Sequence, residues 1–273
     1  MIISFLILGG FQSVISNKVF SFTGHYQVNQ FVLSQSLEDS PTSTNSEFYT
    51  NFRDRDYIEH VQVFANKPAL IKGEEEVEGV MMKGVGRDFD SLAFKPSIVK
   101  GRFIQFGDNG SSSNEIVVST KIARKMLLDV GSKVTMYFVQ DPPRFRRLEV
   151  VGLYETFLED FDDKFILGDI RVIQVLNDWD EDKVGGFEVF LKDPQTIDLY
   201  EDELYESIDY DLRLTKATDK FIQIFDWLEL LNNNVYVFLA LILFVASFNM
   251  VSILFILIME RTSMIGLLRN VLG

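Results

Sequence analysis

The longest uninterrupted run of apolar residues lies near the C-terminus. No residue between Val235 and Met259 is charged, and Asn249 is the only strongly polar side chain there. As a helix, this run would rise roughly 35–39 Å at about 1.5 Å per residue, which is enough to cross a hydrocarbon core of about 30 Å. The pattern therefore predicts a transmembrane helix over residues 234–259.

A second apolar run, Met1–Phe11, is too short to span a membrane by itself. No Lys or Arg precedes it and no small-residue cleavage site follows, so it does not resemble a signal peptide. We interpret residues 1–22 as the end of a first transmembrane helix and the stalk after it. We expect the start of that helix, and further sequence after Gly273, to belong to a longer protein of which this chain is a fragment or an abbreviated gene model.

Short apolar and alternating segments fill the region between the two membrane segments. They predict strands at 26–33, 61–71, 77–85, 115–119, 134–139, 148–154, 186–191 and 211–215, and helices at 11–22, 87–94, 120–127, 169–176, 196–207 and 218–232. Strands and helices alternate irregularly, which predicts an α+β domain over 23–217. Its length of about 200 residues is sufficient to bury a core. An amphipathic stalk helix, 218–233, then leads into the transmembrane segment.

Composition excludes several classes of function. The formal net charge is −14, and Lys and Arg form no stripe with interleaved aromatic residues, so nucleic-acid binding is not expected. The chain has no cysteine, which excludes disulfides, thiolate metal sites and cysteine nucleophiles.

Motifs for cofactors and metals are incomplete. Gly79 and Gly84 have the spacing of a P-loop, but the Lys and Ser/Thr that should follow are absent. The acidic run 178–182 begins like a calcium loop, yet it lacks Gly at the sixth position and Glu at the twelfth. His25 and His60 are the only histidines, and no nucleophile elbow accompanies them. We expect no cofactor, no metal and a non-catalytic chain whose energy source is a partner.

The charges that flank the long apolar run indicate its orientation. Arg261 and Arg269 follow the run closely, whereas Asp226 and Glu229 precede it without a nearby base. Short basic flanks favour the cytoplasmic side, while a long domain is translocated largely regardless of its charge. The C-terminal end is therefore predicted to be cytoplasmic, and the acidic domain to be outside.

The residues after the long apolar run resemble a known family. The run Glu260-Arg261-x-x-Met264-Ile265-Gly266-Leu267-Leu268-Arg269 is similar to the "ERxxEIGxLRAxGA" segment of FtsX/MacB-type ABC transporter permeases. The remainder resembles the lipoprotein-releasing (LolC/LolE) branch of that family, in family order along nearly the whole chain. The matching pieces are Ile15–Phe20, Gly24-His25, Gly79-Val80 with Lys83–Val85, Ile98–Arg102, Glu115–Ser119, Ala123–Leu128, Val130–Val134 and Val150–Tyr154.

The resemblance implies an architecture and a set of partners. It implies four transmembrane helices and a large periplasmic domain, a MacB-like core of porter and sabre subdomains, between the first two. The β-rich sabre subdomain would be inserted over about residues 95–170. The family's permeases pair, as homodimers or heterodimers, on a cytoplasmic ABC ATPase dimer in the bacterial inner (plasma) membrane. Members of this branch release lipoproteins from the inner membrane, toward the outer membrane, to a periplasmic carrier.

The segment 260–273 is the candidate ATPase-coupling helix. If it is helical, Met264, Ile265 and Leu268 share one side with residues 271 and 272. The resemblance assigns ATPase coupling to Glu260, Arg261, Met264, Ile265, Gly266, Leu268 and Arg269. The alternative is an interfacial helix whose bases face acidic lipid headgroups.

Two further candidates lie outside the coupling helix. A proline-containing turn with Pro142, Pro143, Arg144, Phe145 and Arg146 occupies the place of the family's carrier-binding hook, in a shortened form. An ordinary hairpin with solvated bases is an equal alternative. An apolar stripe, Val14, Ile15, Val19, Phe221, Phe225 and Leu228, would line an access route for lipid or substrate acyl chains, although simple packing of the stalk helices is favoured.

The function indicated by these features is that of an ABC transporter permease subunit for lipoprotein release. One alternative is an FtsX-like signalling permease that controls cell-wall hydrolases, but its outer domain is usually smaller. A second is a MacB-like exporter of peptides or toxins.

Overall fold

The structure is a computed structural model that describes residues 2–32, 38–73, 76–107 and 111–272. For residues 2–6, 53, 232 and 262–272 it describes the backbone alone. The chain divides into two compact units. One unit joins residues 1–16 to residues 221–273, and the other contains residues 17–220. We describe each unit by itself.

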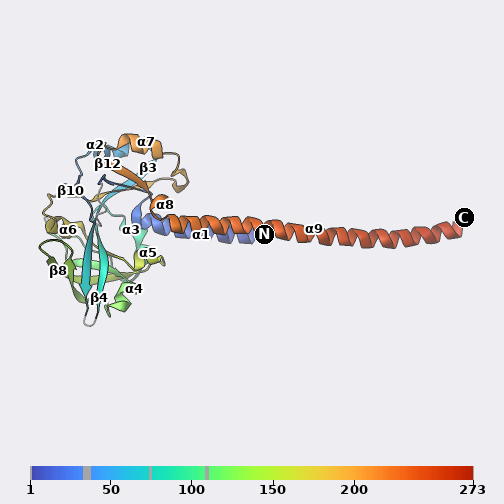
Figure 1. The fold of residues 1–273 in the computed structure, drawn as a ribbon, viewed down its shortest axis with the longest axis horizontal. Coiled ribbons are helices and arrows are strands. Elements are labelled where there is room, and N and C mark those ends of the chain that lie inside the picture. The colour runs from blue at the N-terminus through green and yellow to red at the C-terminus, as the bar shows by residue number, and fades with distance from the viewer. Residues whose placement is uncertain (1, 33–37, 74–75, 108–110, 273) are drawn as a thin grey trace. The chain divides into compact units, whose positions relative to one another are not determined.

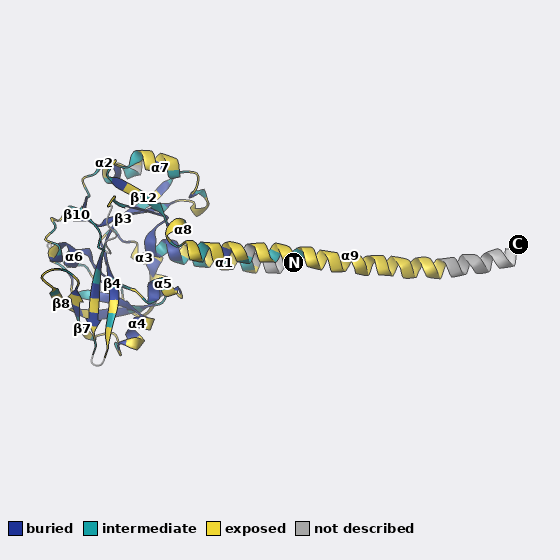
Figure 2. Ribbon diagram, viewed as in Figure 1, coloured by how far each residue is buried: buried dark blue, intermediate teal, exposed yellow. Residues whose placement is uncertain are grey.

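The first unit is helical. It contains most of α1 (Ile2–Thr23) and all of α9 (Ile222–Leu272). The two helices lie side by side where the rings of Phe11 and Trp227 meet edge-on at 5.8 Å and Gln12 Nε2 donates to the Leu228 carbonyl at 2.9 Å. Between residues 222 and 261, α9 is the only helix among the described residues that is long and apolar enough to cross a membrane. Its most apolar stretch is exposed (Figure 2).

The second unit is an α+β domain built on a large sheet (Figure 1). Its strands are β1 Tyr26–Gln30, β2 Thr42–Ser43, β3 Ile58–Lys72, β4 Val77–Val85, β5 Ile98–Gly101, β6 Glu115–Ser119, β7 Lys133–Phe138, β8 Arg144–Tyr154, β9 Phe165–Asp169, β10 Lys183–Val184, β11 Gly186–Leu191 and β12 Leu212–Lys216. Its helices are α2 Glu47–Thr50, α3 Ser91–Phe94, α4 Thr120–Lys125, α5 Glu159–Asp162, α6 Ile170–Leu176, α7 Glu201–Ser207 and α8 Ala217–Lys220. Three 3-10 turns lie at Phe52–Asp54, Lys95–Ser97 and Pro194–Thr196.

Ten of the described strands form one sheet in the order β12-β1-β11-β3-β4-β9-β6-β8-β5, with β7 paired to β3 and β8. The long β3 changes partner along one edge, because it pairs with β11 over 58–64 and with β7 over 69–72. Its other edge pairs with β4. The pairings β3-β4-β9-β6-β8-β7-β3 therefore close into a ring of six strands.

Burial alternates along β7, as a strand with one covered face requires, whereas β6, β9 and β11 are buried over most of their length. In β7 the side chains of Val134, Met136 and Phe138 are buried, whereas those between them are partly or fully exposed. An aromatic cluster anchors the end of α1 to the domain: the Phe22 ring contacts those of Phe94, Tyr154, Phe161 and Phe165. The core thus includes the last turn of α1.

The strands between residues 98 and 169 belong to the same sheet as the strands that flank them. The inserted subdomain over 95–170, and the boundaries at 22, 217, 233 and 259, stay predictions.

Candidate functional site

The first and last strands of the domain lie next to each other, so the chain enters and leaves the domain at neighbouring points. Strand β1 follows α1 and pairs antiparallel with β12, the last strand before α8. The Ala217 N–H donates to the His25 carbonyl at 2.9 Å, which ties the start of α8 to the start of β1. The connection after α1 needs Gly24, since its φ is +70° and an added Cβ would lie 3.1 Å from the backbone N and O of Val189.

A cluster of polar side chains is buried beside this junction. Glu188 of β11 is 0% exposed, and its carboxylate accepts from Lys83 Nζ at 2.6 Å. It also accepts from Gln27 Nε2 at 3.0 Å and Gln62 Nε2 at 2.8 Å. The Lys83 ammonium donates in addition to the Phe22 carbonyl in the last turn of α1 and lies 4.8 Å from the centre of the Phe22 ring. We call Lys83, Glu188, Gln27 and Gln62 the buried polar cluster.

Burial lowers the pKa of the Lys83 ammonium from its ordinary value, and the Glu188 carboxylate opposes part of that shift. The pair is a buried ion pair, for which the cost of removing both charges from water is large. The two glutamine amides satisfy further lone pairs of the carboxylate, which is the condition under which such a pair is tolerated.

His25 is buried next to the cluster and is held as a neutral imidazole. Its Nδ1 accepts from the Leu191 N–H at 3.0 Å, so the ring proton is on Nε2. Burial lowers the pKa of His25 to about 4. Its ring packs against Phe20 at a centroid distance of 4.4 Å.

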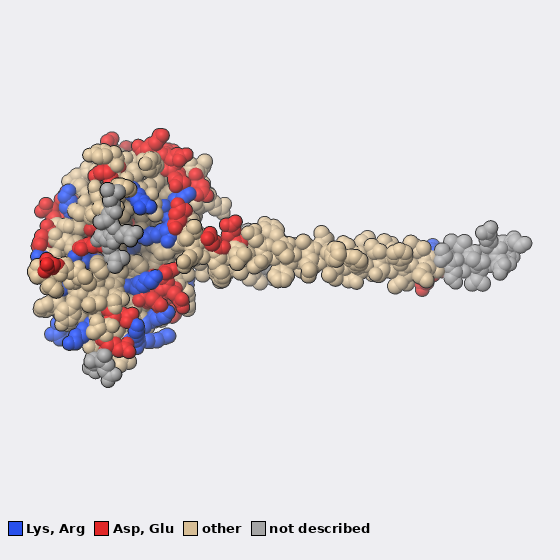
Figure 3. Space-filling model, in the orientation of Figure 1, with Lys and Arg blue, Asp and Glu red and all other residues tan. Residues whose placement is uncertain are grey.

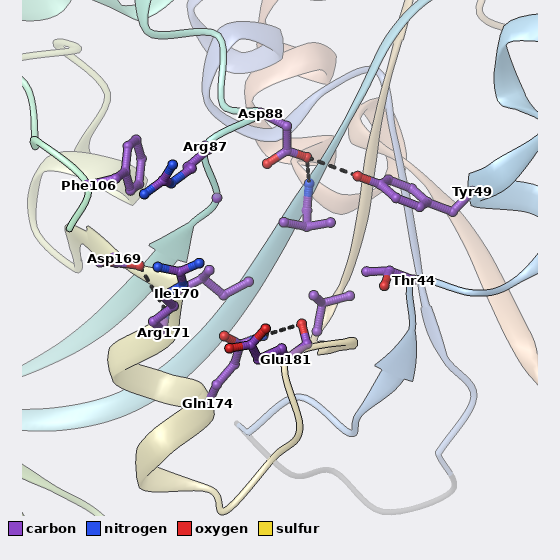
Figure 4. A pocket seen from close by; sticks show the side chains of 13 residues that line it. Thr44, Tyr49, Arg87, Asp88, Phe106, Asp169, Ile170, Arg171, Gln174 and Glu181 are labelled. Atoms are coloured by element: carbon purple, nitrogen blue, oxygen red, sulfur yellow. Dashed lines mark hydrogen bonds between the residues drawn. The ribbon is translucent and has the colours of Figure 1, made fainter. Parts of the chain in front are cut away.

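A pocket of about 320 Å³ lies between α2, β3, the 86–88 turn and α6 (Figure 4). Its polar groups hold the fold together. Asp88 accepts from the Val63 N–H at 2.7 Å, and Asp169 caps α6 through the Arg171 N–H at 3.0 Å. Gln174 donates to the carbonyls of Glu181 and Lys183. Asp88, Asp169 and Gln174 are therefore engaged with the backbone around the pocket.

The proline-containing turn connects β7 to β8, and the arginines after it lie on β8. Arg144 is engaged within the chain: its guanidinium contacts the Asp178 carboxylate at 2.8 Å and the Leu176 carbonyl at 2.9 Å. Phe145, with 63% of its surface exposed, faces outward with Tyr137, its cross-strand partner. The available contact surface of the hairpin is therefore Tyr137, Phe145 and Arg147, with Pro142 and Pro143 at its exposed tip.

Charge is distributed unevenly over the domain. Acidic side chains gather over α7, and basic ones gather at the opposite end of the domain, over β8 and α4 (Figure 3).

Comparison with known proteins assigns the family. The profile of the MacB-like periplasmic core domain matches residues 1–206. The chain belongs to this family. The predicted α+β fold of a MacB-like periplasmic core is thereby confirmed.

Individual relatives are more distant. The lipoprotein-releasing system transmembrane protein LolC of Neisseria meningitidis serogroup B is 24% identical over 281 residues, which cover 99% of this chain and 65% of LolC. The chain thus spans 65% of the length of this relative. The periplasmic region of MacB from Actinobacillus actinomycetemcomitans superposes with a TM-score of 0.51 at 12% identity, covering 78% of this chain and 97% of that one. The extracellular domain of the ABC-type transporter YknZ from Gram-positive bacteria gives 0.46 at 14% identity, covering 70% and 98%.

The coupling residues predicted in this MacB-like chain fall at the end of α9. The side chains of Glu260 and Arg261 are described, and those of Met264, Ile265, Gly266, Leu268 and Arg269 lie outside the described side chains. The backbone of 262–272 continues α9 as a helix.

The predicted access stripe is divided between the two units. Val14, Ile15, Phe221, Phe225 and Leu228 belong to the helical unit, while Val19 belongs to the domain and is fully buried. Within the helical unit Leu228 is also buried, at 4% exposure, and Val14 is 53% exposed.

The buried polar cluster was not among the sites predicted from sequence. The available signal was a charged or amide residue beside apolar residues within a strand: Lys83 in β4, Glu188 in β11 and Gln62 in β3. Such residues read as the solvent side of an alternating strand, and only the pairing of β3 with both neighbours brings them together.

Proposed function

We propose that this chain is part of the permease subunit of an ABC transporter. The main support for this proposal is that a MacB-like periplasmic core, matched over residues 1–206, is followed by a helix that is apolar enough to cross a membrane between residues 222 and 261. In this proposal the domain is periplasmic, the inner membrane holds residues 234–259, and residues 260–273 reach the cytoplasm. Residues 1–22 and 218–233 connect the domain to the membrane.

The proposed subunit is non-catalytic and has two protein partners. A cytoplasmic ATPase dimer supplies the energy, and a second permease, identical or different, completes the membrane part. Purification of the full-length protein from membranes in mild detergent, followed by mass spectrometry, tests this proposal. We expect an ATPase of the ABC class in the complex. Recovery of a full-length protein that transports without any nucleotide-hydrolysing partner would refute it.

The proposed cargo is a lipoprotein released from the inner membrane toward the outer membrane. The support is the likeness to LolC, which covers 99% of this chain. Depletion of the full-length protein should cause a mature lipoprotein to accumulate in the inner membrane, as measured by membrane fractionation. A signalling permease would instead alter cell-wall hydrolysis without that accumulation, and a MacB-like exporter would reduce secretion of a peptide.

We propose that the end of α9 docks on the ATPase through Glu260, Arg261, Met264, Ile265, Gly266, Leu268 and Arg269. A bulky side chain in this segment should uncouple ATP hydrolysis from transport. We expect the transporter complex with Gly266→Trp to hydrolyse ATP without releasing cargo. The complex with Phe248→Trp, a position earlier in the same helix that is 60% exposed, should behave like the wild type. Normal coupled release by Gly266→Trp would favour a helix that only lies on lipid.

We propose that the β7–β8 hairpin contacts a periplasmic carrier through the exposed Pro142, Pro143, Phe145 and Arg147, together with the half-buried Arg146, and that Arg144 supports it through Asp178. The test variant is Phe145→Ala with Arg146→Glu and Arg147→Glu, which leaves the Arg144–Asp178 contact intact. The control, Lys95→Glu with Arg124→Glu, reverses two exposed bases elsewhere on the domain. Carrier capture should fall only in the hairpin variant, and equal capture by both variants would assign the hairpin a purely structural role.

We propose that the access stripe serves first to pack α1 against α9 and second to admit acyl chains. Val14 is the most exposed member of the stripe, at 53%, and Leu228 is buried. A photo-reactive side chain at Val14 should therefore crosslink a lipoprotein, and one at Tyr210, an exposed position of the domain, should not. Absence of the adduct at Val14 would leave packing as the role of the stripe.

A further inference from the structure

The buried polar cluster connects both ends of the domain through three strands. The Phe22 carbonyl in the last turn of α1 accepts from Lys83 of β4, and Lys83 contacts Glu188 of β11 at 2.6 Å. Gln27 of β1 donates to the same carboxylate oxygen at 3.0 Å. The carbonyl oxygen of the Gln27 amide then accepts from Lys220 Nζ at 2.5 Å, at the end of α8. Polar contacts thus run without a break from the end of α1 to the end of α8.

A side branch extends the cluster to a third element. Gln62 of β3 donates to Glu188 at 2.8 Å, and its carbonyl oxygen accepts from the Asp90 N–H at 3.0 Å. Asp90 caps the start of α3. The position of one carboxylate therefore fixes β1, β3, β4 and β11 relative to the last turn of α1.

Stability alone is a weak reason for such an arrangement. A buried ion pair contributes little net stability, because well-packed apolar residues of similar volume often serve as well or better. The pair instead requires a defined geometry, because the Lys83 ammonium must reach both the Phe22 carbonyl at the C-terminal end of α1 and the Glu188 carboxylate. A cation at a helix C-terminus is also favoured by the helix dipole. These directional contacts resist displacement of α1 against the sheet in a way that apolar packing does not.

We infer that the buried polar cluster, with Lys220, is a joint that makes the ends of α1 and α8 move together with the sheet. This inference rests on the proposed permease function, in which movement of the membrane helices must reach the periplasmic domain. Lys83, Glu188, Gln27 and Lys220 are positioning residues in this role. They touch neither nucleotide nor cargo, and they act through the helices and strands that they hold.

The test is hydrogen exchange of the full-length protein, reconstituted in lipid with the ATPase that co-purifies with it. Exchange of peptides from β4, β11 and α9 is measured with and without a non-hydrolysable ATP analogue. The main variant, Lys83→Met with Glu188→Leu, removes both charges at once, because either single change would leave one charge buried and unpaired. A milder variant, Lys220→Met, removes the contact with Gln27 and leaves the Lys83–Glu188 pair in place.

Matched controls lie close by. Lys216→Met removes a lysine that pairs with Glu201 at 2.8 Å and Asp198 at 3.1 Å, outside the cluster. Lys220→Arg keeps a donor near Gln27. The ATP analogue should change hydrogen exchange in α9, β4 and β11 of the wild type and of both control variants, Lys216→Met and Lys220→Arg. In both joint variants the change should persist in α9 and be lost in β4 and β11, with thermal midpoints like that of the wild type.

Each other outcome is decisive. If the ATP analogue still changes hydrogen exchange in β4 and β11 of the double variant as it does in the wild type, the inference is refuted. If the double variant does not accumulate, the same result in Lys220→Met refutes it. A wild type that responds in α9 but not in the sheet also overturns it, because nothing would be transmitted. A wild type that responds nowhere refutes the proposed permease function itself, and the joint with it.

Discussion

Acidification should reveal two buried groups with opposite effects on stability. The pKa of His25 is lowered from 6.5 to about 4 by burial, so its contribution to stability is complete above pH 6.5 and is lost as the pH falls toward 4. The pKa of Asp39 is raised to about 6, mainly by burial, so its contribution is complete below pH 3.8 and is lost as the pH rises through 6. In the wild type the two effects oppose each other between pH 6.5 and 4.

The magnitudes follow from the two shifts. Between pH 7.5 and 4.5 the lowered pKa of His25 removes about 2.5 kcal/mol from the free energy of unfolding. The raised pKa of Asp39 adds at most about 2 kcal/mol over the same range, and solvent screening reduces this because Asp39 is partly exposed. Asp39 accepts from the Asn66 N–H at 2.7 Å and from its side-chain amide at 3.0 Å, and an asparagine at position 39 keeps one acceptor there.

Three variants separate the two groups. When the pH is lowered from 7.5 to 4.5, the free energy of unfolding of His25→Gln should rise by about 2.5 kcal/mol relative to that of the wild type. The free energy of unfolding of Asp39→Asn should fall by up to about 2 kcal/mol relative to that of the wild type. The double variant should be the sum. The measurement is urea unfolding of the full chain in detergent micelles, followed by Trp179 fluorescence in a Trp227→Phe background. Other carboxyl groups cancel when variants are compared. Parallel pH profiles of His25→Gln and the wild type would refute the assignment of a buried neutral imidazole at position 25.

Three further changes should alter stability in the same assay. Phe22→Ala should lower the free energy of unfolding by about 3–5 kcal/mol, because removal of a ring that is 1% exposed leaves a cavity among four aromatic neighbours. Phe145→Ala, at an exposed position, should change it by no more than about 0.5 kcal/mol. Gly152→Ala should cost about 1–3 kcal/mol, since its Cβ would lie 2.2 Å from the Arg102 carbonyl oxygen, while Gly79→Ala, whose nearest neighbour is 3.9 Å away, should cost less. Glu188→Leu alone should cost about 3–5 kcal/mol by leaving Lys83 unpaired, and adding Lys83→Met should restore most of that loss; equal unfolding of the single and double variants would contradict the pairing.

Several elements were predictable because their sequence signals are local. The strands predicted at 115–119 and 186–191 match β6 and β11 to the residue, since each is an apolar run bounded by polar or glycine residues. The helix predicted at 169–176 begins one residue later. Asp169 is its N-cap, with the side chain accepting from the Arg171 N–H.

Other elements were missed or misplaced where tertiary contacts decide. Strand β9 is only five residues long and was not predicted, although it lies in the sheet between β4 and β6. The helix predicted at 87–94 is confined to Ser91–Phe94, because Asp90 caps it and Asp88 binds the Val63 N–H instead of continuing a helix. The helix predicted at 196–207 is divided into a 3-10 turn, Pro194–Thr196, and α7.

The candidate sites show the same division between local and long-range information. The proline-containing turn and its arginines are visible in the sequence, but the partner of Arg144, Asp178, lies 34 residues further along the chain. Lys83 and Glu188 are separated by 105 residues. A single charged residue in a strand predicts a solvent-facing position, and only the pairing of distant strands converts these two into a buried pair.

Pro68 illustrates how one residue can conflict with a local rule and agree with the topology. Proline cannot donate to a sheet and is normally confined to edges or bulges, yet the apolar pattern predicted a strand through it. The β11 pairing of β3 ends at Phe64 and the β7 pairing begins at Ala69, so Pro68 lies where the partner on that edge changes. Its carbonyl accepts from the Val139 N–H on the β7 side, and the missing N–H would point to the same edge. Pro68 therefore cannot return a bond to Val139, so this pair keeps one bond where an antiparallel pair can have two, and Pro68 lies at the position where β3 leaves β11 and joins the six-strand ring.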